Sequence, residues 1–214
     1  VTLRLAGSCQ LLGDSSSGKS TILDAVQFVL VGDLTQIQFN KAANERSKRS
    51  LGGYLRYKLG SEVESDDGAS GEESGRKQRF GRGACTGYVL LQFADHSDPD
   101  EGFICGSAME ASDSESTHVD HWEFIMSRSA YPDVDDVPVI TANNYVQPAR
   151  DFRAVLKTKP GAHPYLSVKD YQEELRHRLG ALPQAFHHLL VKALGFRPIG
   201  QVKQFVMDYL LDPK

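Results

Sequence analysis

Residues 13–20 have the types and spacing of a phosphate-binding loop. Their sequence, G-D-S-S-S-G-K-S, fits the pattern G-x-x-x-x-G-K-[ST] at every fixed position. Glycine allows backbone torsions that other residues resist, and successive N–H groups at the start of a helix attract phosphate oxygens. Lys19 is predicted to bridge the β- and γ-phosphates of a nucleoside triphosphate, and Ser20 to bind Mg²⁺. The predicted binding residues are Gly13, Asp14, Ser15, Ser16, Ser17, Gly18, Lys19, Ser20 and Thr21.

The elements around this loop are predicted from apolar spacing. Residues 1–5 are expected to form an edge strand, and residues 9–12 a short buried strand that leads into the loop. Apolar residues then recur at helical spacing from 19 to 31, and Gly32 is a suitable C-cap. The expected order is therefore strand, loop and helix, which is the setting in which the glycine-rich pattern binds phosphate.

The rest of the chain divides into a low-complexity segment, a β region and a helical region. Residues 61–83 are first acidic and then basic, with Gly and Ser throughout, and are predicted to form a flexible insertion. Three short apolar runs joined by polar turns favour an antiparallel meander, at 87–93, 102–109 and 121–126. Three helices are predicted to follow, beginning near Ser167 (the expected N-cap), Leu182 and Gly200.

A catalytic acid is harder to assign than the loop. Hydrolysis by a P-loop protein needs a carboxylate at the end of a buried strand, where it holds Mg²⁺ and polarises water. Asp33 follows an apolar run that lies on the predicted helix, and Asp95 follows a predicted strand without a second acid, which favours an ordinary turn. Residues 50–53 (Ser-Leu-Gly-Gly) have the wrong order and position for the Leu-Ser-Gly-Gly signature of ABC-type ATPases. The sequence thus predicts a nucleotide-binding half without a catalytic half.

The composition limits the remaining function classes. A chain of 214 residues with 40% hydrophobic residues suits one domain with insertions. A net charge of −4 argues against nucleic-acid binding over the whole surface but allows a local basic face. No apolar run reaches the ~18 residues of a membrane span. Cys9, Cys85 and Cys105 lack metal-ligand spacing and are expected to be reduced packing residues of a cytoplasmic protein.

The loop and the start of its helix also suggest a family. Residues 13–25, G-D-S-S-S-G-K-S-T-I-L-D-A, resemble the start of the head of SMC and MukB-like ATPases, where G-x-N-G-S-G-K-S-x-[IL]-[IL]-D-A is usual. The chain departs from that pattern with Ser15 in place of Asn and Ser16 in place of Gly, both at positions that the phosphate pattern leaves variable.

Two further blocks carry the resemblance. Residues 39–44 and 47–56 look like the stretch after the first helix in the MukB-like SMC subunit of Wadjet-type plasmid-defence systems, of the JetC and MksB type. Residues 196–202, with Phe205 and Val206, are similar to the segment where such heads present the Q-loop and enter the coiled coil. In these proteins the signature motif and the Asp-Glu strand lie beyond the coiled coil, which would account for the missing acids.

The resemblance implies an α/β fold. Residues 1–214 would be the N-terminal lobe of a P-loop NTPase head of the ABC or SMC type, with an antiparallel β layer and C-terminal helices leading towards a coiled coil. The chain opens on Val1, and we expect it to be a piece of a longer protein. Two heads of a homodimer would enclose two ATP molecules with Mg²⁺. Hydrolysis would require the full-length dimer, and the chain alone would be inactive. The implied partners are the C-terminal lobe, the second subunit, kleisin and KITE-type subunits, a nuclease subunit and double-stranded DNA in the nucleoid, with no membrane.

Further site residues follow from the resemblance. Gln201 is the predicted glutamine that reaches Mg²⁺ and the attacking water, with Gln204 or a plain helix surface as alternatives, so catalysis is assigned to Lys19 and Gln201. Arg49 is the predicted nucleotide contact in the basic stretch 41–58, which also contains Arg46 and Arg56. That stretch faces DNA phosphates or solvent in the alternative interpretations.

Other residues receive structural interpretations. Trp122 is expected in the core, and His187 with His188 on a helix surface. Two other functions stay open from the sequence: a self-contained P-loop kinase or NTPase acting on a small substrate, with Asp95 as its acid, and a regulatory module that binds ATP without hydrolysing it.

Overall fold

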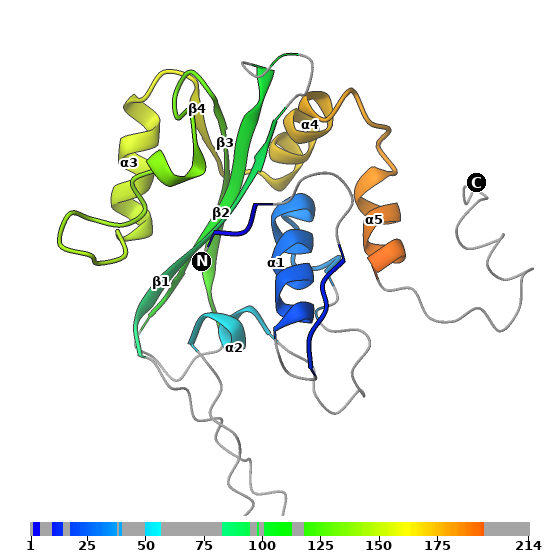
Figure 1. The fold of residues 1–214 in the computed structure, drawn as a ribbon, viewed down its shortest axis with the longest axis horizontal. Coiled ribbons are helices and arrows are strands. Elements are labelled where there is room, and N and C mark those ends of the chain that lie inside the picture. The colour runs from blue at the N-terminus through cyan, green and yellow to red at the C-terminus, as the bar shows by residue number, and fades with distance from the viewer. Residues whose placement is uncertain are drawn as a thin grey trace, which may run out of the picture.

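The fold is built on one antiparallel sheet (Figure 1). The computed structural model describes residues 2–4, 10–14, 18–37, 39, 50–56, 83–94, 98, 101–112 and 118–194. The four strands lie in the order β1-β2-β3-β4, with bounds β1 Cys85–Phe93, β2 Phe103–Ala111, β3 Asp120–Ser127 and β4 Ala162–Tyr165. Each neighbouring pair is antiparallel, which confirms the predicted meander of the first three strands.

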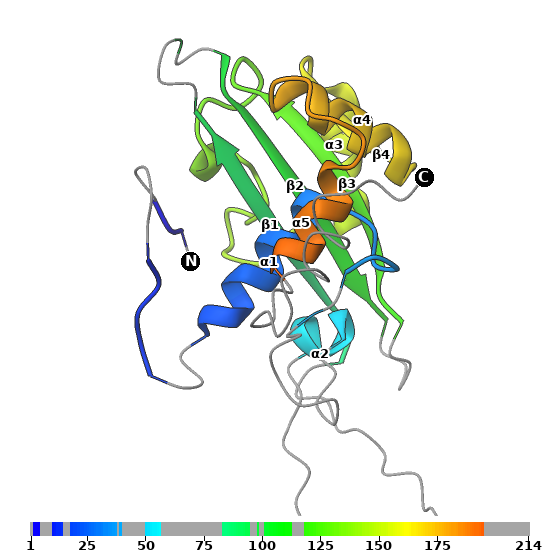
Figure 2. The ribbon, with the colours of Figure 1, turned by 90° about the vertical axis from the view of Figure 1, so that its right-hand side faces the viewer.

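Two layers of helices cover the sheet. Helix α3 (Ala149–Thr158) lies on one face, and α1 (Lys19–Val31), α2 (Leu51–Arg56), α4 (Val168–Arg178) and α5 (Phe186–Leu194) lie on the other (Figures 1 and 2). A short 3-10 helix, η3 (Val134–Asp136), precedes α3 on its face. The fold is thus a sheet between helices, an α/β arrangement in which α1 rests on one face.

Side-chain alternation along the strands supplies a core to each face. On β3, Phe124 and Met126 pack with Phe152 of α3, whereas Ile125 packs with Val29 of α1. Successive side chains of a strand point to opposite faces, so one strand serves both cores. Gly106 on β2 is required by a close approach, because a Cβ there would lie 2.4 Å from Phe124 Cζ.

The helices on the two faces follow local sequence signals. Ser167 is the N-cap of α4, its side chain accepting from Asp170 N at 3.3 Å, which confirms the predicted start. Tyr171 and Leu175 then bury one face of that helix at i, i+4 spacing. Helix α5 begins at Phe186, a turn later than the predicted start at Leu182. Within the described part of the chain, no helix is long and apolar enough to cross a membrane.

The predicted strands before the loop are wrong where the structure describes them. Residues 2–4 and 10–12 are irregular, and Leu12 is 80% exposed. Arg4 instead forms ion pairs with Asp133 at 3.3 Å and Asp135 at 2.7 Å. A strand needs a neighbouring backbone to pair with, and the described contacts of this segment are made by side chains. The predicted insertion at 61–83 (except Gly83) and the helix near Gly200 lie outside the described residues.

Candidate functional site

The described ends of the phosphate-loop pattern are joined by the side chain of Lys19. Lys19 Nζ donates to Gly13 O at 2.7 Å and to Asp14 O at 2.6 Å, so the side chain folds back over the start of the loop. Gly18 is the N-cap of α1 with φ +91°, a left-handed conformation that L side chains rarely adopt. A Cβ on Gly18 would meet nothing within 4 Å, so the backbone torsion, and not a lack of space, requires glycine here.

The chemistry available at this turn is anion binding. The first N–H groups of α1 carry the positive end of the helix dipole, and Lys19 adds a full positive charge on the same side. Ser20 and Thr21 are exposed in the first turn, where a hydroxyl can bind a cation that accompanies a phosphate. Residues 15–17 of the predicted site lie outside the described residues.

Helix α2 holds the first half of α1 in place. Tyr54 Oη donates to the carboxylate of Asp24, which is buried just over one turn after Lys19. Ser50 Oγ accepts from Gly53 N at 3.1 Å and so caps α2, a structural role for the Ser-Leu-Gly-Gly segment. Arg56 is 2% exposed and donates to Ser112 O. Arg56 therefore does not belong to a solvated or ligand-facing basic patch, because its guanidinium is buried and donates to a backbone carbonyl inside the fold.

The other end of α1 is held by side chains from α4 and α5. Tyr171 Oη donates to Val29 O at 2.8 Å, and Gln172 Nε2 donates to Val31 O at 2.7 Å. His187 places Nδ1 3.0 Å from Leu30 O. These carbonyls belong to the last turn of the helix, where no intrahelical donor is left. The prediction that His187 lies on a surface is wrong, because it is 4% exposed and faces this helix end.

Gly32 completes the same helix end. It confirms the predicted C-cap, with φ +65° and its N–H donating to Phe28 O at 2.9 Å. Asp33 accepts from Thr35 N, Thr35 Oγ1 and Gln36 Nε2 in the turn that follows. Burial raises the pKa of Asp33, but these hydrogen bonds outweigh burial and the net shift is downward. Asp33 is therefore a turn residue at the far end of α1, about 20 Å along the helix axis from the loop.

A buried acid lies under this end of α1. Glu123 on β3 is 3% exposed, and burial raises its pKa to about 8. His121 Nε2 lies 3.5 Å from Glu123 Oε1, but burial lowers the pKa of His121 despite its hydrogen bond to the backbone of Gly32. Both groups are thus neutral near pH 7, so their contact is not an ion pair there. The acid lies beside Gly32, at the end of α1 away from the loop.

The remaining predicted residues divide into those the structure places and those it does not. Trp122 is confirmed in the core, stacked on Phe152 at 6.1 Å between ring centroids. Cys105 is buried and Cys85 half-buried, both as free thiols. The predicted contacts that lie outside the described residues are Arg46, Arg49, Asp95, Gln201 and Gln204.

The residues that position α1 were not predicted from the sequence. Tyr54, Gln172 and His187 each make a contact with this helix that no local sequence pattern predicts. Tyr171 had a signal, its i, i+4 spacing with Leu175, but that spacing predicted burial and not the bond to Val29.

Comparison with known proteins supports the interpretation of residues 13–20 as a phosphate-binding loop. The family described as P-loop containing region of AAA domain matches residues 1–46, which include the loop and all of α1. No curated protein matches the chain. The geometry and this match define a nucleotide-binding P-loop region on an α/β fold with a four-stranded antiparallel sheet. The bound group expected of such a region is a nucleotide with Mg²⁺.

Proposed function

We propose that the chain is the ATP-binding N-terminal lobe of an SMC-like, ABC-type ATPase head. Together with a C-terminal lobe and a second head, it drives ATP-dependent DNA loop extrusion or entrapment, in plasmid defence or chromosome maintenance. The proposal rests on the resemblance of residues 13–25, of residues 39–44 and 47–56, and of residues 196–202 with Phe205 and Val206 to MukB-like heads of the Wadjet type. It also rests on the exposed apolar side chains on either side of the loop. ATP with Mg²⁺ is the proposed ligand.

The observation that carries this proposal is the surroundings of the loop. The sheet beneath α1 is antiparallel throughout its described strands, whereas hydrolysis needs an acid at the end of a strand beside the loop. Leu12 is 80% exposed before the loop, and Leu23 is 50% exposed one turn after Lys19. Apolar side chains on both sides of a phosphate site favour a second lobe that packs there and supplies the missing acid and strands.

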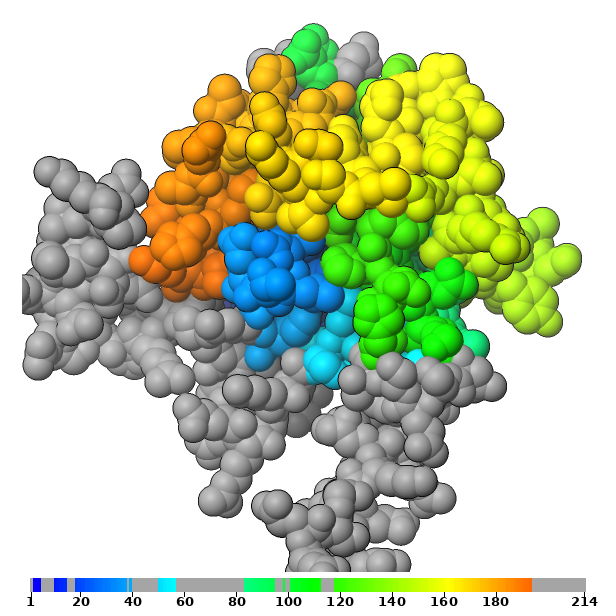
Figure 3. Space-filling model, turned by 180° about the vertical axis from the view of Figure 1, so that it is seen from behind, coloured from blue at the N-terminus to red at the C-terminus, as the bar shows by residue number. Residues whose placement is uncertain are grey.

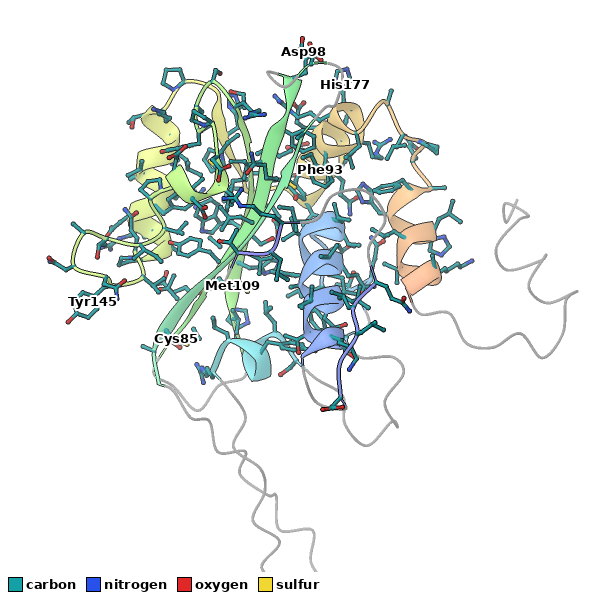
Figure 4. All side chains as sticks on the ribbon, in the orientation of Figure 1. Cys85, Phe93, Asp98, Met109, Tyr145 and His177 are labelled. Atoms are coloured by element: carbon teal, nitrogen blue, oxygen red, sulfur yellow. The ribbon has the colours of Figure 1, made fainter. Side chains whose placement is uncertain are left out.

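The self-contained kinase or NTPase is less well supported. Its acid would be Asp95, two residues after the end of β1 at Phe93. Phe93 packs in the cluster of Val29 and Tyr171, at the opposite end of α1 from the loop, and Figure 4 places Phe93 high on the sheet while α1 begins at the bottom. The rise of the helix from Lys19 to Val29 is about 15 Å, so the described end of β1 lies well away from the loop.

The resemblance to MukB-like heads implies the remaining partners of the proposed assembly. The second head of a homodimer would supply the signature motif, and kleisin, KITE-type and nuclease subunits would complete the complex on double-stranded DNA. Gln201 would reach Mg²⁺ and the attacking water, and Arg49 would contact the nucleotide.

The experiment compares ATP binding and hydrolysis by residues 1–214 alone with those of the chain joined to its C-terminal half. We expect the chain alone to bind ATP·Mg²⁺ without turnover and the joined head to hydrolyse ATP. Turnover by the chain alone that is abolished in Lys19→Ala would contradict the proposal and favour the self-contained NTPase.

A further inference from the structure

Helix α2 is fixed to the sheet through its last two residues. Cys85 Sγ at the start of β1 donates to Leu55 O at 3.7 Å. The Arg56 guanidinium donates to Ser112 O, just after the end of β2. Leu55 also packs closely on β1, where a Cβ on Gly87 would lie 2.5 Å from Leu55 Cδ1. Strands β1 and β2 therefore set the position of α2, and this short helix can support another element.

Tyr54 connects this supported helix to α1. Its Oη donates to the carboxylate of Asp24, a residue that is 8% exposed. The Tyr54 ring packs edge-on against Phe39, with 5.4 Å between the ring centroids, and Phe39 in turn packs against Phe28 of α1. In Figure 3 the cyan atoms of α2 lie against the blue atoms of the segment that contains α1. Because packing holds the ring, its hydroxyl meets the buried carboxylate from a fixed direction.

Asp24 lies one turn after Ser20 on the same face of α1. Asp24, Phe28 and Val31 are buried at i, i+4 and i+7 spacing along this helix. Ser20, four residues before Asp24, extends that stripe to the loop end, where it is exposed. In an α-helix, residue i+4 donates its N–H to the carbonyl of residue i, and the two Cβ atoms are about 5–6 Å apart. Holding Asp24 therefore also holds Ser20, the residue expected to bind Mg²⁺ at the loop.

We propose that Tyr54 is a positioning residue for Mg²⁺ at the phosphate-binding loop, acting through Asp24 on Ser20 and not on the nucleotide directly. A side chain behind a metal ligand fixes the orientation of that ligand, and its loss typically lowers metal affinity about 10- to 100-fold. Tyr54 has the corresponding place here, with one turn of α1 between its partner Asp24 and Ser20. The inference rests on the proposed function, since it requires the loop to bind ATP with Mg²⁺.

A purely structural role for the Tyr54 bond makes a different prediction. Lys19 and the first N–H groups of α1 are expected to bind the phosphates, which are present with or without Mg²⁺. Ser20 is needed only for the cation. A shift of Ser20 therefore weakens the binding of ATP·Mg²⁺ and spares the binding of metal-free ATP. A general loosening of α1 weakens both.

The test uses Tyr54→Phe, which keeps the ring against Phe39 and removes only the hydroxyl. Affinity for ATP is measured by isothermal titration calorimetry in excess Mg²⁺ and again in EDTA, alone and in a Ser20→Ala background. Tyr88→Phe is the matched control, because Tyr88 Oη donates to Gln147 O at 2.7 Å on the α3 face, opposite α1. The melting temperature of each variant verifies folding.

Tyr54→Phe is expected to lower affinity for ATP·Mg²⁺ about tenfold and affinity for ATP in EDTA by less than about twofold. In the Ser20→Ala background the further loss should also stay below about twofold, because the two residues act on the same ion. Tyr88→Phe should change neither affinity by more than about twofold. Unchanged affinity in Tyr54→Phe, equal losses with and without Mg²⁺, or a full tenfold further loss after Ser20→Ala would overturn the proposal. No binding of ATP by the wild-type chain in either condition would contradict the proposed function, and this inference with it.

Discussion

The two ends of α1 differ in almost every physical respect. At its start, Gly18 is the N-cap and Lys19 donates to the carbonyls of Gly13 and Asp14, at the phosphate-loop end of the helix. At its finish, Tyr171, Gln172 and His187 take up the last carbonyls, and Gly32 fits against the Tyr171 ring. One end is polar and accessible, whereas the other is buried and bonded to α4 and α5.

This contrast assigns the two ends different roles. A helix that binds an anion at its N-terminus must keep that end open, since a competing capping group would occupy the N–H groups. The same helix must not shift when the ligand arrives, and the bonds at its C-terminus supply that anchor. We therefore expect substitutions at the anchored end to change folding stability and substitutions at the open end to change nucleotide affinity.

The largest effect is expected at the anchored end. Tyr171→Ala removes a fully buried ring and its bond to Val29, and should lower the free energy of unfolding by about 3–5 kcal/mol in urea titrations. Tyr171→Phe keeps the ring and should cost about 1–2 kcal/mol. Tyr145→Ala, at a tyrosine that is 73% exposed, should change stability by no more than about 0.5 kcal/mol. A loss below about 1 kcal/mol in Tyr171→Ala would remove the distinction between the ends.

Lys19→Ala tests the open end. Loss of the ammonium should weaken ATP·Mg²⁺ binding about 100-fold, or about 2.7 kcal/mol, in isothermal titration calorimetry. Stability should change little, because the described bonds of the lysine are to carbonyls of the exposed loop residues Gly13 and Asp14. Lys169→Ala on α4 removes an exposed lysine far along the chain and is the control, with an expected change below twofold. Unchanged affinity in Lys19→Ala would show that the loop does not bind the phosphates.

The pH dependence of stability tests the buried acid near the anchored end. The folded-state pKa of Glu123 is raised to about 8, so its contribution to stability is complete below the unfolded pKa and is lost as pH rises through about 8. Relative to Glu123→Gln, the wild type should lose about 2 kcal/mol between about pH 5.5 and 7, since each pH unit in this window is worth about 1.4 kcal/mol.

The comparison with Glu123→Gln is needed because buried histidines act in the opposite direction. Burial lowers the pKa of His121 and His187, so their contribution is present above the unfolded pKa and is lost as pH falls. Both histidines remain in the variant, and the difference between the two unfolding curves isolates the carboxyl. Parallel curves would mean that Glu123 is ionised in the folded protein.

The smallest effect compares the two glycines at the helix ends. Gly18→Ala should cost about 1 kcal/mol from the left-handed torsion alone, because a Cβ there meets nothing within 4 Å. Gly32→Ala should cost more, because its Cβ would also lie 3.0 Å from the Tyr171 ring. Urea titrations of the two variants measure the difference, and equal losses would mean that Tyr171 yields without cost.

The sequence predicted those parts of the fold whose local signals are strong. Apolar periodicity and the Gly32 cap located α1 with its bounds Lys19–Val31. Three short apolar runs joined by polar turns located β1, β2 and β3 within about two residues. Helix α3 carried a signal that was missed, Pro148 at its start followed by Phe152 and Leu156 at i, i+4 spacing.

Other elements depend on contacts that no local pattern encodes. Helix α2 contains Gly52 and Gly53, which weaken a helix, and is held by the Tyr54 bond to Asp24 and the Arg56 bond to Ser112. Strand β4 contains Pro164, which lacks the N–H of a ladder and suits an edge. The pattern at the loop identified Lys19 directly, but the anchor at the far end of α1 arises from residues about 140 to 160 positions away.

Hydrogen exchange along α1 tests most directly that the open end binds the nucleotide while the other end is a fixed anchor. Amide protection is measured for residues 18–22 and 29–32 with and without ATP·Mg²⁺. The prediction is slower exchange at 18–22 on adding nucleotide, with 29–32 already protected and unchanged, and no response in Lys19→Ala. Unchanged exchange at 18–22, or a response confined to 29–32, would contradict this assignment.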